Sequence, residues 1–198
     1  MHALSERKHP LRILALYPHG RFTGHALLDE DELVLGATFA TNIQRRGPLE
    51  ARLDAVARLV RGSTRLYRPD AIVVVRSPDR TFAERCIEIA RALLPLHVRD
   101  DEELQHLFVP PDAEEYDHLG QSVTRVFCPE LARGMTSWRR GNESKRRRVR
   151  PVWKATAGAI AVMAELRPLA VRTMARGPLP PGLASALSRS FTSPDSPV

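Results

Sequence analysis

The chain has 198 residues, 43% of them hydrophobic, which allows one good-sized domain with its own core plus a tail. Its 30 Lys and Arg residues outnumber 23 Asp and Glu residues, so the protein is basic with a net charge of +7. The longest apolar runs are too short to span a membrane, and the first residues lack the apolar core of a signal peptide. From these features we expect neither a membrane-spanning nor a secreted protein but a cytoplasmic one.

The N-terminal part predicts a leader followed by a small antiparallel sheet. Residues 1–10 have the composition of a flexible leader. Residues 11–40 alternate apolar and polar side chains in three short segments, which predicts a three-stranded meander. Pro18 and Gly20 supply the chemistry of the first turn.

Helices and strands are then predicted to alternate. Residues 48–67 repeat apolar side chains at helical spacing. The spacing of Thr81 and Glu84 predicts a capping box at the start of a second helix. Apolar runs predict two further strands at residues 71–75 and 96–98.

The C-terminal part predicts one more helix and a tail. An apolar, alanine-rich helix is expected over residues 151–166, which closes a single domain over residues 11–166. Residues 167–198 are rich in Pro and Ser, which predicts a tail that is largely disordered at its end.

The two cysteines are spaced like neither a zinc site nor a redox pair. Cys86 lies among apolar helical residues, which predicts a buried free thiol, and a disulfide with Cys128 is the less favoured alternative. A reducing cytoplasm agrees with this interpretation.

The first hairpin, ILALYPHGRFTGHAL at residues 13–27, resembles a known family. It is similar to the opening of bacterial Holliday-junction resolvases of the RuvC type, roughly I-L-G-I-D-P-G-x-R-x-T-G-Y-x-V. Arg68-Pro69-Asp70 is close to that family's Q-P-D before its fourth strand. The similarity is good over residues 11–76 and continues by element order to residue 166. It implies an α/β fold of ribonuclease H-like type: a mixed sheet whose three-stranded antiparallel meander is followed by α-β-α-β-α. The sugar-kinase and actin hairpin is the second choice.

The same resemblance implies that the family's four metal-binding carboxylates are missing. Their positions fall on residues of other types: Tyr17, Val75, Ala155 and Gly158. The stretch from Lys145 to Ala164, where the last two acids belong, contains no Asp or Glu. Two-metal phosphodiester cleavage needs carboxylates to hold two Mg²⁺ ions about 4 Å apart, and a phenol is a poor Mg²⁺ ligand. We therefore expect no metal, no cofactor and no nuclease activity.

Most of the net charge lies in one segment, residues 139–150, expected to be a mobile loop or a fraying helix start. Guanidinium groups pair with phosphates, and a neighbouring indole can stack on an unpaired base. The candidate nucleic-acid-binding residues are Trp138, Arg139, Arg140, Lys145, Arg146, Arg147, Arg148 and Arg150, with Arg21 of the first hairpin.

Two classes of function stay open. One is a catalytically inactive, resolvase-like domain that binds nucleic acid, DNA before RNA, with a homodimer implied by the resemblance alone. The other is a protein-assembly subunit whose basic segment docks on an acidic partner. A third interpretation of the basic segment is a solvated loop without a binding role. A rebuilt metal site at Asp100 and Asp101 is a weaker possibility, because acids at a helix start are explained by the helix dipole. His19 and His25 show no catalytic partner in the sequence.

Overall fold

A five-stranded mixed sheet forms the centre of the protein. A computed structural model describes residues 10–19, 22–30, 32–40, 48–110, 118–127 and 143–191. The strands are β1 (Ile13–His19), β2 (Phe22–Asp29), β3 (Glu32–Ala40), β4 (Ala71–Arg76) and β5 (Leu96–Asp100). Their order is β3-β2-β1-β4-β5, with an antiparallel meander through β1–β3 and parallel pairing of β1 with β4 and β4 with β5. The predicted ribonuclease H-like fold is confirmed.

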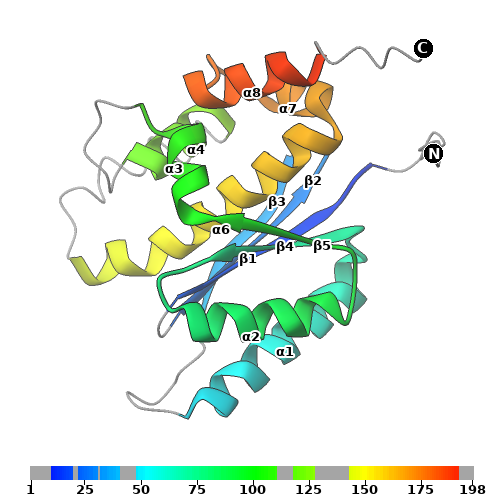
Figure 1. Ribbon diagram of the computed structural model, residues 1–198, viewed down its shortest axis with the longest axis vertical. Helices are drawn as coiled ribbons and strands as arrows, with labels where there is room; N and C mark the ends of the chain where they lie inside the picture. The colour runs from blue at the N-terminus through cyan, green and yellow to red at the C-terminus, as the bar shows by residue number, and fades with distance from the viewer. Residues whose placement is uncertain are drawn as a thin grey trace, which may run out of the picture.

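Helices cover both faces of this sheet, as Figure 1 shows. On one face lie α1 (Leu49–Tyr67) and α2 (Arg80–Arg91), and the long helix α6 (Glu143–Leu166) crosses the other. The remaining helices gather on the α6 side: α3 (Asp101–Phe108), α4 (His118–Phe127), α7 (Pro168–Met174) and α8 (Pro181–Phe191).

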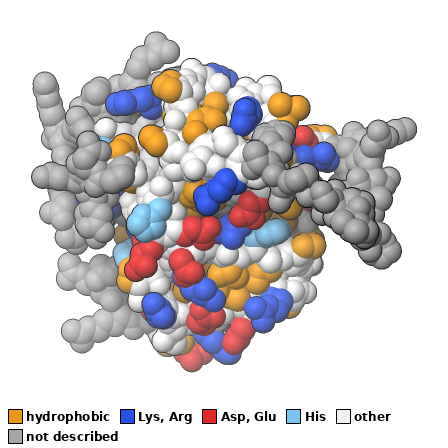
Figure 2. All heavy atoms as spheres, turned by 45° about the horizontal axis from the view of Figure 1, so that its top comes forward, with side chains coloured by type: hydrophobic (Ala, Val, Ile, Leu, Met, Phe, Trp, Pro, Cys, Tyr) orange, Lys and Arg blue, Asp and Glu red, His pale blue; other side chains and the backbone are white. Residues whose placement is uncertain are grey.

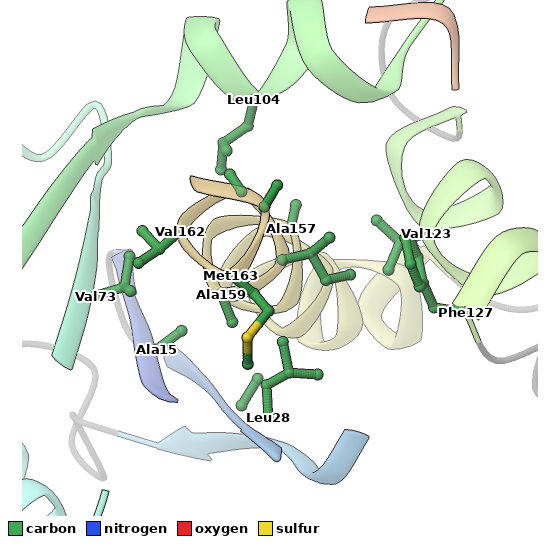
Figure 3. Close-up of a cluster of buried hydrophobic side chains, with 14 of the residues drawn as sticks. Ala15, Leu28, Val73, Leu104, Val123, Phe127, Ala157, Ala159, Val162 and Met163 are labelled. Carbon is green, nitrogen blue, oxygen red and sulfur yellow. The ribbon is translucent and has the colours of Figure 1, made fainter. Parts of the chain in front are cut away.

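The alternation along β1 divides the core in two. Leu14 and Leu16 belong to the cluster under α1 and α2, whereas Ala15 and Tyr17 belong to the cluster around α6. Because α6 is packed between the sheet and the outer helices, it is apolar on every side from residue 155 to residue 164. Figure 3 shows its Ala157, Ala159, Val162 and Met163 among side chains of the sheet, α3 and α4.

The start of α6 corrects the predicted boundary. The helix begins at Glu143, so residues 143–150 are helical. Of the two forms expected for the basic segment, a mobile loop or a fraying helix start, the loop is wrong for these residues. Pro151 lies inside the helix. A proline is typical of a first turn but is tolerated further in at the loss of one backbone hydrogen bond, which is why it misplaced the boundary.

The end of the chain is the second correction. Residues 168–174 and 181–191 form α7 and α8 within the region predicted to be a tail. Val171, Leu183 and Leu187 are fully buried in the α6 cluster, so packing stabilises two short helices in a stretch with many Pro and Ser residues. Residues 192–198 and residues 1–9 of the predicted leader, residues 1–10, lie outside the described residues.

The start of α2 also differs from the prediction. Its N-cap is Asp79, whose carboxylate accepts a hydrogen bond from the Phe82 backbone N–H, so the cap is not Thr81. Arg52 of α1 donates to the same carboxylate at 2.8 Å and lies over the Phe82 ring. The cap therefore also links α1 to α2.

Cys86 is a free, fully buried thiol, as predicted, and burial raises its pKa to about 12. Such a thiol is protonated and unreactive in the folded protein. Cys128 lies outside the described residues. None of the helices in the described ranges is long and apolar enough to cross a membrane.

Candidate functional site

The carboxyl ends of three parallel strands meet at one edge of the sheet. β1 ends at His19, β4 at Arg76 and β5 at Asp100, and α6 crosses over the same edge. Open sheets of this type place ligand sites outside the carboxyl ends of their strands. This edge is therefore the first place to look for function.

A glycine on β2 lets α6 approach the sheet closely there. A Cβ atom added to Gly24 would lie 2.0 Å from the backbone carbonyl carbon of Pro151, so only glycine fits. Gly24 is paired with Tyr17 across the first hairpin. The glycine of the hairpin's Thr-Gly pair is thus explained by packing, because it allows α6 to lie beside the end of β1.

Two of the four positions that the resemblance aligns with the family's acids, Tyr17 and Val75, lie near the carboxyl ends of β1 and β4 at this edge. Tyr17, Val75 and Ala155 are buried in the same apolar cluster. Gly158 faces Val75 so closely that an added Cβ would lie 2.5 Å from a Val75 methyl carbon. These positions hold a packed apolar contact and one phenol.

A lysine lies beside Tyr17 at this edge. Lys154 forms an ion pair with Asp101, the first residue of α3, and its ammonium lies 5.2 Å from the centre of the Tyr17 ring. No sequence motif predicted a role for Lys154. The signal was present nevertheless, because Lys154 is the one charged residue between positions 151 and 164.

His19 lies beside this cluster at the surface. Its ring stacks on Tyr17 with 5.6 Å between ring centres. Loss of solvation lowers the pKa of His19, the Lys154 ammonium lowers it further, and the carboxylates of Asp101 and Asp79 act in the opposite direction. The imidazole is therefore neutral at pH 7, and Lys154 is the cation among these groups.

The acidic residues at the end of β5 and the start of α3 form ion pairs with different cations. Asp100 lies 3.4 Å from Arg76, which also binds Glu84 at 2.8 Å. Asp101 pairs with Lys154, so the two aspartates proposed for a rebuilt metal site bind different partners. Within the described ranges, no three His, Cys, Asp or Glu side chains are grouped as a metal site requires.

The donors at this edge do not fit the Mg²⁺ pair of the resolvase family. Mg²⁺ prefers ionised oxygens in an octahedral arrangement. The aligned positions offer only the phenol of Tyr17, and the ammonium of Lys154 would repel a divalent cation placed beside it.

The basic segment leads directly into this edge. Lys145, Arg146, Arg147, Arg148 and Arg150 lie in the first turns of α6. At about 1.5 Å per residue, position 150 is about 6 Å and position 146 about 12 Å along the helix from Lys154. In Figure 1 the N-terminal end of α6, in yellow, extends past the side of the sheet on which β1 ends. Arg21, Trp138, Arg139 and Arg140 lie outside the described residues.

Burial increases from Arg150 to the residues that follow it in α6. Arg150 is half-buried, whereas the following Pro151 and Val152 are buried. Trp153 packs on Gly120 of α4 and is 9% exposed, so this indole is part of the core.

One face of the described part of the protein shows a mixture of charges. On the face drawn in Figure 2, acidic and basic side chains lie interspersed over the lower part of the view. Ion pairs such as Arg85–Glu88 at 2.6 Å are of this exposed kind and add little stability. The concentration of positive charge is thus a property of the segment before Pro151, where seven Lys and Arg residues face one Glu between positions 139 and 150.

Comparison with solved structures gives the same fold. The structure of RuvC from Thermus thermophilus aligns with a TM-score of 0.53 and 11% identity, covering 79% of this chain and 96% of that chain. T. thermophilus RuvC in complex with a Holliday junction substrate aligns with a TM-score of 0.51 and 14% identity over the same shares. The yeast mitochondrial Holliday junction resolvase Ydc2 aligns with a TM-score of 0.41 and 11% identity, covering 93% of this chain and 85% of that chain. No family model and no curated protein sequence matches the chain. At these identities, the likeness to RuvC shows the fold.

Proposed function

We propose that this resolvase-like fold serves as a catalytically inactive module that binds nucleic acid, DNA in preference to RNA. The binding groups are the basic side chains at and before the start of α6, with Trp138 stacking on an unpaired base and Arg21 adding a contact from the first hairpin. DNA is favoured because a RuvC with this fold is known in complex with a Holliday junction. A homodimer, implied by the resemblance, is part of the proposal, and sedimentation of the purified chain tests it.

One observation carries this proposal. Tyr17, Val75 and Ala155 are buried in one apolar cluster, and Gly158 packs against Val75, at the positions where the resemblance places the family's metal-binding acids. A phosphodiester brought to this edge would find no carboxylate-held metal to stabilise the charge of the transition state. Binding without cleavage is the function that such an edge supports.

The basic segment supplies the binding energy. Each Lys or Arg that reaches a phosphate releases a condensed counterion, so the affinity falls with rising salt. If about five of these cations reach phosphates, the logarithm of the affinity should fall with the logarithm of salt at a slope of roughly −4. Such binding depends little on base sequence.

A salt titration with charge-matched variants tests the proposal. The variant R146A/R147A/R148A removes three cations from α6, and R58A/R61A/R65A removes three exposed cations from α1 on the opposite face. Losing three phosphate contacts should reduce the salt slope on duplex DNA by roughly 3, whereas the α1 control should leave it nearly unchanged.

Two outcomes would contradict this function. Equal affinities of the wild type and the α6 variant would remove the assigned interface. Tight binding to poly-glutamate with no binding to DNA or RNA at low salt would favour a protein-assembly role instead.

A further inference from the structure

The strongest unexplained feature is the Lys154 ammonium at the edge where the resemblance places the metal ions of the resolvase family. Lys154 belongs to α6, Asp101 begins α3, and Tyr17 is near the end of β1. The three residues join elements that are far apart in the sequence at a single point. A bound metal ion links separate elements in the same way.

We propose that Lys154 is a tethered cation that replaces the metal ions of this fold structurally. Its ammonium neutralises Asp101, lies against the Tyr17 ring and links α6, α3 and β1. The domain then needs no divalent cation to hold this edge together, and the edge takes none. This inference goes beyond nucleic-acid binding and does not depend on it.

The ion pair of Lys154 with Asp101 is largely buried, which makes the ammonium important for stability. The side chains of Lys154 and Asp101 are 15% and 22% exposed, so both charges are largely withdrawn from water. The second carboxylate oxygen of Asp101 is buried and has no hydrogen-bond partner among the described residues. Asp101 therefore relies on Lys154, and removing one partner of such a pair leaves a buried charge without compensation.

The Tyr17 ring adds a second contact. An ammonium within about 6 Å of an aromatic ring centre is attracted by the electron-rich face of the ring. The 5.2 Å separation satisfies this condition. A phenol in place of a carboxylate thus suits a monovalent organic cation better than Mg²⁺.

Thermal unfolding of four proteins, each in EDTA and in excess MnCl₂ at matched ionic strength, tests the proposal. They are the wild type, K154M, D101N and the double variant K154M/D101N. The wild type should melt at the same temperature in both solutions. K154M should melt lower by roughly 10 °C, because Asp101 keeps its charge without a partner. The double variant should recover most of this loss, because neither charge remains. E88Q, which breaks the exposed pair with Arg85, is the control and should change little.

Three results would overturn the assignment. One is a manganese-dependent rise in the melting temperature of the wild type that D101N abolishes, because the edge would then hold a metal. Another is a melting temperature of K154M equal to that of the wild type. The third is a double variant no more stable than K154M. If K154M does not fold, the double variant decides: its folding supports the proposal and its failure contradicts it. No nucleic acid is present, so this result is separate from that of the binding experiment.

Discussion

The two parts of α6 differ in chemistry although one helix contains both. Residues 143–150 carry five Lys and Arg residues and one Glu, and residues 151–166 carry one Lys and one Glu. From residue 151 to residue 164 the second part is largely buried between the sheet and the outer helices (Figure 3). Burial in the core explains the apolar residues of the second part, whereas the first part concentrates five cations in two turns. The difference separates what α6 does for the fold from what we propose it does for a partner.

The largest expected effect is a loss of stability at the buried part. Gly158→Asp places a side chain against Val75 and a carboxylate in an apolar cluster, which should lower the free energy of unfolding by at least about 3 kcal/mol. Gly62→Asp makes the same change on α1, where an added Cβ meets no atom within 4 Å, and should change stability by less than about 0.5 kcal/mol. Denaturant unfolding measures both. Equal effects of the two substitutions would contradict the close packing of α6 on β4.

The basic part should show the opposite pattern. R146A/R147A/R148A replaces three cations by alanine, the strongest helix former, so we expect a change of no more than about 1 kcal/mol in the free energy of unfolding. Duplex DNA binding by the same variant should weaken strongly at low salt. Denaturant unfolding and a binding titration on one preparation separate the two. A variant that unfolds easily would place the segment in the structural part of the helix.

Acidification should also act on the packed domain and leave the basic part unchanged. Burial lowers the folded-state pKa of His25, so this residue stays neutral in the fold but binds a proton in the unfolded chain near its ordinary pKa of about 6.5. Stability is thus retained above that pH and declines as the pH falls through it. His19 and His97, whose pKa values are also lowered, act in the same direction.

Thermal unfolding from pH 7.5 to pH 5 measures this decline, and His25→Gln should make it shallower. Lys and Arg keep their charge throughout this range, so the basic segment should bind DNA at every pH at which the domain stays folded. A decline of the same steepness in His25→Gln would assign the effect to other groups.

The smallest expected effect concerns the indoles. Trp153 is a core residue, so in a W138F background its fluorescence should hardly respond to added single-stranded DNA or to iodide. Trp138, in a W153F background, should be quenched by single-stranded DNA if it stacks on a base. Quenching of Trp153 instead would require α6 to open on binding.

The sequence predicted the sheet because its signals are local. The turn at Pro18, the β-branched run after Ala71 and the helical spacing from Leu49 each act over a few residues, and the structure contains the hairpin, β4 and α1 accordingly. The family resemblance then placed the elements in the right order, which local patterns alone did not.

The errors come from contacts between residues far apart in the sequence. α8 exists because Leu183 and Leu187 enter a core that composition does not reveal. The continuation of α6 before Pro151 contradicted two local signals, a proline and a run of like charges. The Lys154–Asp101 pair joins residues 53 positions apart, so the local sequence around either residue does not predict the ion pair.

One reaction tests the central claim directly. The purified protein is mixed with a labelled four-way DNA junction in Mg²⁺ at low salt, and the bound fraction and the cleaved fraction are read from the same sample. We predict a complex whose DNA stays intact and which dissociates as salt is raised. Cleavage that depends on Mg²⁺ would contradict the catalytic inactivity, and the absence of any complex would contradict the nucleic-acid interface.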